Sequence, residues 1–205
     1  MMPIQRKAEP AGFDAAVRKP GQKWLAKHAI ARTQRLRADA VIEPYWRACL
    51  DDLHRSYDGI CAYLCIYIER VMGAASTDHF VAKSRIAGLA YEWTNYRLSC
   101  TAMNARKRDF DTVMDPFTLQ PGTFRLELVS GRIYPAPKLS APRRRAAQRT
   151  IERLGLDDAG CRELRARRFS DYLELRGGER NRAAEAQLQR YAPFLYEEAR
   201  RQKLL

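Results

Sequence analysis

Polar residues in the middle of the chain have the types and the order needed to hydrolyse a phosphodiester bond. Asp78 and His79 are adjacent, and Asn95 and Asn104 follow along the chain. A histidine has an ordinary pKa of about 6.5, so at neutral pH its ring can take a proton from an attacking water, which Lys or Arg cannot do. His79 is therefore the candidate general base.

Oxygen donors for a divalent cation accompany this base. The Asp78 carboxylate and the side-chain oxygen of Asn104 are hard ligands of the kind that Mg²⁺ or Mn²⁺ prefers, and such an ion keeps several of its waters. This ligand set suits one metal ion better than two. A cation there would offset the charge that builds on a phosphate during hydrolysis.

The adjacency of Asp78 and His79 sets a condition on the backbone. Successive side chains of a regular strand point to opposite faces, so both can face one ion only at a bulge or at a strand end. We therefore expect one of these two features at this position.

Basic residues around the motif are candidates for contacts with a phosphate backbone. The chain has a formal net charge of +13 and a pI of about 9.8, so it attracts polyanions, and nucleic acid is the expected partner. The alternative is a basic protein that is merely soluble. The predicted contacts are Lys83 and Arg85 beside the first strand, and Arg106 and Lys107 beyond Asn104.

The segments around the motif are expected in the order strand, loop, strand, helix. Residues 61–68 are apolar and rich in aromatic and β-branched side chains, which favours a strand leading to the site over the end of a helix. A second short strand, broken at Gly73, runs from 71 to 81. We then expect a turn or short helix at 86–93, a strand at 96–100 and a helix at 102–108.

The remainder of the chain is predicted to be mainly helical. Pro44 can open a helix, and the alternating residues on both sides of a glycine turn in 124–135 indicate a β-hairpin. The run from Arg143 to Arg145, which precedes a helix predicted at 146–154, is either a phosphate contact or a solvated linker. A further helix is expected from Asp157 or Asp158 to about residue 175.

The predicted fold class is α+β, with one catalytic unit. A chain of 205 residues is short for two independent domains. Prolines and charges in 1–20 favour a flexible N-terminal arm. The expected organisation is this arm (1–20), a catalytic domain with flanking helices (21–175) and a C-terminal helix (176–205).

The motif resembles the HNH, or ββα-metal, endonucleases. The resemblance covers residues 40–175 and is strongest at 77–109. It implies a ββα-metal core with a small β-hairpin between N- and C-terminal helices. It also implies metal ligation by Asp78 and Asn104, and a catalytic pair in which Asn95 orients His79 or its loop.

Residues 90–100, 150–156 and 162–168 look like parts of bacterial phage-defence HNH proteins, including Septu-like and retron-associated ones. This resemblance implies a Mg²⁺- or Mn²⁺-dependent DNA endonuclease that acts as the effector of an anti-phage defence or restriction system.

The cysteines depart from the pattern of many HNH proteins, which hold a structural zinc between two C-x-x-C knuckles. Leu64 takes the partner position after Cys61, with Cys65 one residue late, and Met103 takes it after Cys100. We expect apolar packing in place of the knuckle, with a distorted zinc site as the alternative, because tetrahedral zinc needs four donors.

The chain is expected in the cytoplasm. Its 5 cysteines lack regular spacing, which suits a reducing compartment. Neither a signal peptide nor a run of roughly 18 apolar residues is apparent, so no membrane partner is expected.

Three functions are compatible with these residues. The first is the DNA endonuclease, triggered by a partner protein such as an ATPase or sensor, because no P-loop is present. The second is a non-catalytic nucleic-acid-binding subunit with an HNH-like fold, against which an intact His79 argues. The third is an RNA-cleaving nuclease, because phosphate contacts carry no information about the sugar.

Overall fold

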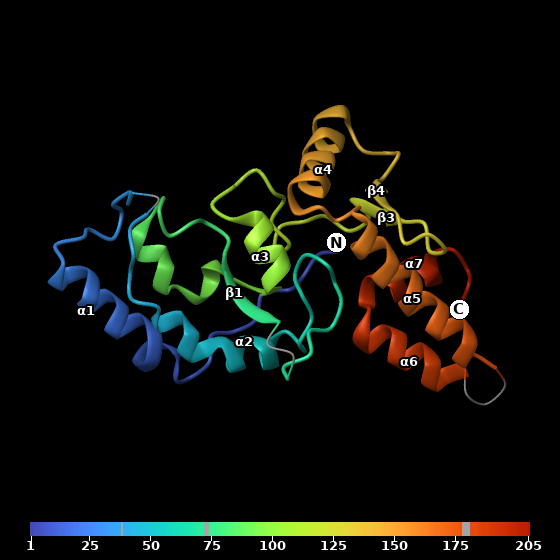
Figure 1. Cartoon of the computed structure of the whole chain (residues 1–205), viewed down its shortest axis with the longest axis horizontal. Coiled ribbons are helices and arrows are strands. Elements are labelled where there is room, and N and C mark those ends of the chain that lie inside the picture. The colour runs from blue at the N-terminus through green and yellow to red at the C-terminus, as the bar shows by residue number, and fades with distance from the viewer. Residues whose placement is uncertain (38, 72–73, 178–180) are drawn as a thin grey trace. The chain divides into compact units, whose positions relative to one another are not determined.

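The computed structural model describes residues 1–37, 39–71, 74–177 and 181–205, and its chain forms two compact units (Figure 1). The central unit comprises Gln5–Gly59 and Ile68–Asp111. The C-terminal unit comprises Met1–Ile4, Ile60–Tyr67 and Thr112–Leu205. The expected α+β class is confirmed: helices predominate, and the described residues form two small antiparallel sheets. The predicted boundary at residue 175 differs from the observed division.

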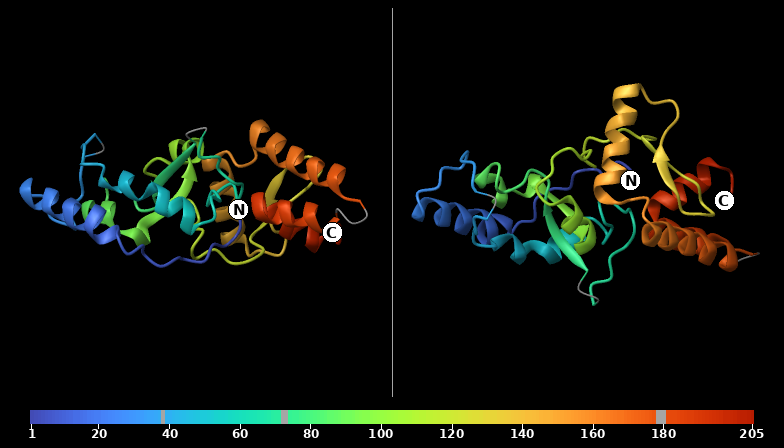
Figure 2. Two further views of the ribbon diagram at one scale, coloured as in Figure 1. Left: turned by 90° about the horizontal axis from the view of Figure 1, so that it is seen from below. Right: turned by 45° about the horizontal axis from the view of Figure 1, so that its top comes forward.

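A β-hairpin-like pair followed directly by a helix forms the middle of the central unit. Strands β1 (Ala75–His79) and β2 (Tyr96–Cys100) pair antiparallel from Ala75↔Cys100 to His79↔Tyr96, and lie side by side in Figure 2. Helix α3 (Thr101–Lys107) begins immediately after β2 and packs on both strands. The predicted strand at 96–100 is confirmed, and the predicted helix at 102–108 differs by one residue at each end.

Short helices join and cover the two strands. The connection between them contains η3 (Ala87–Tyr91) and η4 (Trp93–Asn95), as expected for 86–93. Pro44 precedes η2 (Tyr45–Cys49), which leads into α2 (Leu50–Ser56), and α2 packs against β1 and β2. The part of the predicted 71–81 strand that includes Gly73 lies outside the described residues.

The N-terminal residues are packed, and the expectation of a loose arm at 1–20 is wrong. Phe13 is buried, with its ring edge-on to Trp93 at 5.5 Å and to Tyr96 at 5.7 Å. The indole of Trp93 donates a hydrogen bond to the Lys7 carbonyl. Helices η1 (Asp14–Arg18) and α1 (Lys19–Lys27) then follow, so aromatic burial outweighs the prolines and charges of this segment.

A close approach between α1 and η3 requires glycine at position 21. A Cβ atom there would lie 2.2 Å from Cγ of Tyr91, far inside van der Waals contact. The buried Tyr91 ring therefore occupies the space that any larger residue would need.

Residues 61–67 do not form the predicted strand. The chain turns back on itself. The backbone amide of Cys65 donates to the Cys61 carbonyl at 2.8 Å, and the amide of Cys61 donates to the Ile66 carbonyl at 3.0 Å. Cys65 has a φ of +56°. Most of these side chains are buried without the alternation of a half-buried strand. Their apolar composition reflects burial in the C-terminal unit. Composition alone does not distinguish a buried turn from a buried strand.

The C-terminal unit combines a small hairpin with helices. Strands β3 (Phe124–Leu126) and β4 (Ile133–Pro135) pair antiparallel, which confirms the predicted hairpin. Gly131 in its turn has a φ of +68°, and a Cβ there would meet the Arg162 carbonyl at 2.1 Å. The helices are α4 (Ala141–Leu154), α5 (Ala159–Leu175), α6 (Asn181–Tyr191) and α7 (Pro193–Arg201), so the predicted C-terminal helix is divided at Pro193.

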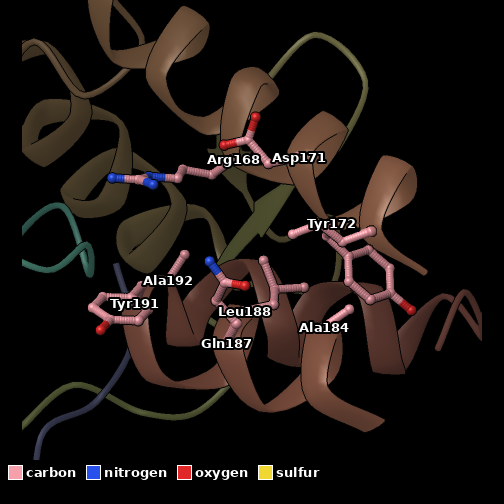
Figure 3. A pocket seen from close by; sticks show the side chains of 9 residues that line it. Arg168, Asp171, Tyr172, Ala184, Gln187, Leu188, Tyr191 and Ala192 are labelled. Carbon is pink, nitrogen blue, oxygen red and sulfur yellow. The ribbon is translucent and has the colours of Figure 1, made fainter. Parts of the chain in front are cut away.

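The seam between α5 and α6 holds a small cavity (Figure 3). Its volume is about 30 Å³, and its walls include Tyr172, Leu188 and Tyr191. Such a space accommodates roughly one water molecule, so we interpret it as a packing defect between helices.

Candidate functional site

A pocket of about 580 Å³ in the central unit brings four of the predicted site residues together: Asp78, His79, Lys83 and Asn104. Asp78 and His79 reach it from the end of β1, and Asn104 reaches it from α3. The pairing of β1 with β2 continues without a bulge to His79, where the strand ends. The strand-end alternative is therefore the one observed, and it allows two adjacent side chains to line one pocket.

One nitrogen of the His79 ring is committed to the protein. Nε2 lies 3.0 Å from the carbonyl oxygen of Ala90, and because a carbonyl only accepts, Nε2 carries the hydrogen. The neutral ring then has its lone pair on Nδ1. Trp46 and Tyr96 hold the ring edge-on, with centroids 4.7 and 5.2 Å away.

The surroundings of His79 keep its ring neutral. Burial lowers the pKa of His79 to about 3, and the nearby charges of Lys83 and Lys107 act in the same direction, while the bond to Ala90 opposes them. At neutral pH the ring is therefore available as a proton acceptor. A polyanion in the pocket would raise this pKa, because negative charge favours the imidazolium.

Lys107 is a buried partner of Asp78, which corrects the prediction that it contacts phosphate. Its side chain has no exposed surface; Nζ lies 3.2 Å from Oδ1 of Asp78 and donates to the His79 carbonyl at 2.9 Å. Phe80 covers the ammonium group, 5.5 Å from its ring centroid. Lys107 thus ties α3 to the end of β1.

The amide of Asn104 is oriented by β1. Nδ2 donates to Oγ of Ser76 at 3.0 Å and to the Thr77 carbonyl at 3.5 Å. With the nitrogen so engaged, the amide oxygen is the atom that can bind a cation.

The donor set fits a Mg²⁺ ion that retains most of its water. Asp78 and Asn104 supply oxygen ligands, and the described residues contain no cluster of three or more His, Cys, Asp or Glu side chains. Oγ1 of Thr77, also at the pocket, is buried and has no hydrogen-bond partner within the described chain, so it could bond a metal-bound water. Because Lys107 offsets the charge of Asp78, the affinity of such a site would be low.

Asn95 lies outside the pocket as a positioning residue, and its expected role of orienting His79 or its loop stays a prediction. Nδ2 donates to the carbonyls of Val81 at 2.9 Å and Leu89 at 3.0 Å, and Oδ1 accepts from the Val81 amide at 2.8 Å. These bonds fasten both ends of the connection between β1 and β2. Since that connection carries Ala90, Asn95 acts on His79 through its loop.

The predicted phosphate contacts fall into different environments. Lys83 lines the pocket with Nζ 4.7 Å from the Trp46 ring centroid, and burial lowers its pKa. Arg85 is exposed and paired with Asp111, and it belongs to a neighbouring pocket. Arg106 is half-buried on α3 and does not line the pocket that holds His79.

Two arginines at the pocket were missed by the sequence interpretation. Arg47 belongs to η2, and Arg108 directly follows α3 with a φ of +54°. Both line the pocket with Lys83. The position of Arg108 in a basic run beside the motif was the one available signal.

The cysteines of the expected knuckle positions are divided between the two units. Cys61 and Cys65 belong to the C-terminal unit and Cys100 to the central unit, and none of the three forms a disulfide within the described part of the chain. The Cys65 sulfur accepts from the Met2 amide at 3.3 Å, and burial raises the pKa of this thiol. Met103 is buried, while Leu64 is half-buried. The expectation of no structural zinc stays a prediction.

Comparison with known proteins finds no matching family model and no matching curated protein. Within the described part of the chain, no helix combines the length and apolar character required to cross a membrane.

Proposed function

We propose that the chain is a divalent-metal-dependent endonuclease of the HNH, or ββα-metal, type that hydrolyses phosphodiester bonds of DNA. The observation that carries this proposal is the bond from Nε2 of His79 to the Ala90 carbonyl. This bond leaves Nδ1 as the basic nitrogen of a ring that lines the same pocket as Asp78 and Asn104. The strand, strand, helix order of β1, β2 and α3 supports the same proposal.

The chemistry follows from the placement of these groups. Nδ1 of His79 takes a proton from a water whose oxygen attacks phosphorus, and the bond from phosphorus to the leaving oxygen breaks. Solvent returns a proton to that oxygen. Meanwhile, the Ala90 carbonyl holds the imidazolium in place. A divalent cation bound by Asp78 and Asn104 would supply Lewis-acid stabilisation of the charge on the phosphate.

The cations of the pocket would bind the substrate without reading its sequence. Lys83, Arg47 and Arg108 line the same space as His79. Phosphate contacts of this kind position a nucleic acid and make its affinity depend on salt. We therefore expect weak sequence preference. A role as the effector of a phage-defence system, triggered by a partner such as an ATPase or sensor, rests on the resemblance of residues 90–100, 150–156 and 162–168.

A cleavage assay tests the proposal. Purified chain is incubated with supercoiled plasmid, and separately with total RNA, in Mg²⁺, Mn²⁺ or EDTA. We expect plasmid nicking or linearisation with metal and none in EDTA. His79→Ala should reduce the rate by at least about a hundredfold while leaving DNA affinity nearly unchanged, because it removes the base and no cation.

His28→Ala is the matched control, because His28 is exposed at the end of α1 and stacks on Trp24. Full activity of His79→Ala would overturn the assignment of the base. Cleavage of RNA with no effect on plasmid would replace the DNA substrate with RNA.

The second candidate is a non-catalytic nucleic-acid-binding subunit. The buried ion pair between Lys107 and Asp78 favours it, because it offsets the charge of the principal metal ligand. DNA binding in EDTA together with no cleavage under any metal would support this alternative over the endonuclease.

A further inference from the structure

Helix α4 has an arginine-rich outer surface whose charges are not neutralised by any carboxylate of the described residues. Arg143, Arg144, Arg145 and Arg149 are all exposed. Arg143 bonds the Gln120 side chain and Arg144 bonds the carbonyls of Pro137 and Leu139. No carboxylate among the described residues forms an ion pair with any of these four arginines.

Several arginines elsewhere in the same unit are paired with carboxylates. Arg162 binds Asp157, Arg167 binds Glu163, and Arg201 binds Glu198. Along α4, by contrast, four exposed arginines lie on one stretch of helix, and none of them is paired with a carboxylate of the described residues.

This arrangement costs helix stability. Arg145 and Arg149 are four residues apart, so they are neighbours on one side of the helix, about 6 Å apart along its axis, and like charges at this spacing repel. Arg143 and Arg144 also lie near the N-terminus of α4, where the helix dipole disfavours positive charge. An external polyanion would relieve both effects.

The character of α4 indicates which polyanion. Its apolar residues Ala147, Ile151 and Leu154 are buried, and it contacts β4 (Figure 1). A helix that binds a membrane surface exposes an apolar face, and a protein interface has an apolar centre. The outer face of α4 exposes no large hydrophobic residue. A cluster of guanidinium groups without exposed apolar side chains suits a phosphate backbone.

We propose that α4 is a second DNA-binding surface, in which Arg145 and Arg149 bind backbone phosphates of a duplex. The surface belongs to the C-terminal unit, whereas the candidate catalytic pocket belongs to the central unit. The choice of DNA as the polyanion rests on the proposed function. The binding itself does not depend on metal or on His79.

A salt titration tests this surface separately from catalysis. Binding of a fluorescent DNA duplex to the full chain carrying His79→Ala is measured in EDTA over a range of salt. In that background, Arg145→Gln with Arg149→Gln should lower the slope of log affinity against log salt by about two. Affinity at physiological salt should fall about tenfold.

The matched control neutralises two exposed arginines of the same unit, Arg182 on α6 and Arg200 on α7, and should bind as the parent does. Replacing Arg145 and Arg149 with lysine keeps the charge and should restore the slope. Circular dichroism verifies that each variant is folded.

Three outcomes would overturn the proposal: an unchanged slope for the glutamine pair, an equal loss in the control pair, or an equal loss in the lysine pair. Tighter binding of an RNA duplex or of anionic vesicles than of DNA would also overturn it. Plasmid cleavage by the wild type, together with an unchanged slope for the glutamine pair, would support the endonuclease and contradict the DNA-binding surface on α4. A reduced slope without plasmid cleavage would support the surface on α4 and contradict the endonuclease.

Discussion

His79 combines a fixed tautomer with a depressed pKa, and both come from groups remote in the chain. Ala90 lies in the connection after β1 and accepts the Nε2 hydrogen, while Trp46 of η2 packs perpendicular to the ring. A base with a low pKa is a weak one. It is nevertheless wholly neutral at physiological pH, and the charge of a bound phosphate would strengthen it.

The pKa of His79 predicts a pH dependence of stability. The pKa of His79 in the folded chain, about 3, lies below the ordinary value of 6.5. Between these two pH values the unfolded chain binds a proton at this ring and the folded chain does not. The contribution of this ring is complete above pH 6.5 and is lost as the pH falls toward the folded value. The loss is at most about 1.4 kcal/mol per pH unit.

Urea unfolding at several pH values between neutral and mildly acidic checks this. The free energy of unfolding of the wild type should fall more steeply than that of His79→Asn, which cannot titrate. Parallel curves for the two proteins would show that the ring is not protected from protonation.

Lys107 and Asp78 form a buried pair, and removal of one partner predicts a metal response. Lys107→Met leaves the Asp78 carboxylate buried without its ammonium partner, which should cost about 3 kcal/mol of unfolding free energy in EDTA. Excess Mg²⁺ should restore part of that loss, because it places a cation beside the same carboxylate.

Thermal unfolding with and without Mg²⁺ measures both effects. Lys83→Met serves as the control, because it removes a pocket cation that has no bond to Asp78. An equal change in the stability of wild type and Lys107→Met on addition of Mg²⁺ would show that Asp78 is not a metal ligand.

The side-chain amide of Asn95 bonds the connection between β1 and β2 at two residues, Val81 and Leu89. Asn95→Ala removes three side-chain hydrogen bonds and leaves backbone groups of Val81 and Leu89 without partners. We expect a loss of about 2 to 4 kcal/mol in stability. We also expect a reduced cleavage rate, because Ala90 no longer holds the ring.

The Nε2 proton of His79 reports on this loop directly by nuclear magnetic resonance. In Asn95→Ala that proton should exchange with solvent faster than in the wild type. Retention of a slowly exchanging proton, with a normal cleavage rate, would assign Asn95 a purely structural role.

Helix α1 depends on the absence of a side chain at position 21. Gly21→Ala places a methyl group against the Tyr91 ring and should destabilise the protein by about 1 to 3 kcal/mol. Gly160→Ala on α5 is the matched control, because a Cβ there meets nothing within 4 Å, and it should be neutral or slightly stabilising. Chemical denaturation of the two variants distinguishes the clash from a general effect of glycine replacement.

The whole molecule should fold without zinc. Leu64 and Met103 take the positions of knuckle cysteines, and neither offers a thiolate. Elemental analysis of the purified protein should show no stoichiometric zinc, and a strong chelator should leave its circular dichroism spectrum unchanged. One tightly bound zinc per chain would return Cys61, Cys65 and Cys100 to the ligand list.

Local sequence determined the elements around the candidate site. Alternation and turn residues predicted β2 and the β3–β4 hairpin, and His79, Asp78 and Asn104 were selected by residue type and order. These features depend on neighbours a few residues away, through backbone hydrogen bonds and the strand and helix periods. The adjacency of Asp78 and His79 by itself also requires a strand end or a bulge, because successive side chains of a strand point to opposite faces.

Only the tertiary structure decided what surrounds each of these side chains. The burial of Lys107 depends on Asp78 and Phe80 of another segment, and the role of Asn95 depends on carbonyls that the folded loop brings to it. Likewise, residues 61–67 and Phe13 are apolar because they pack in the interior. Buried strands, turns and helices all have an apolar composition, so composition does not identify the local structure. Burial and long-range pairing are properties of the assembled unit, so no local pattern could specify them.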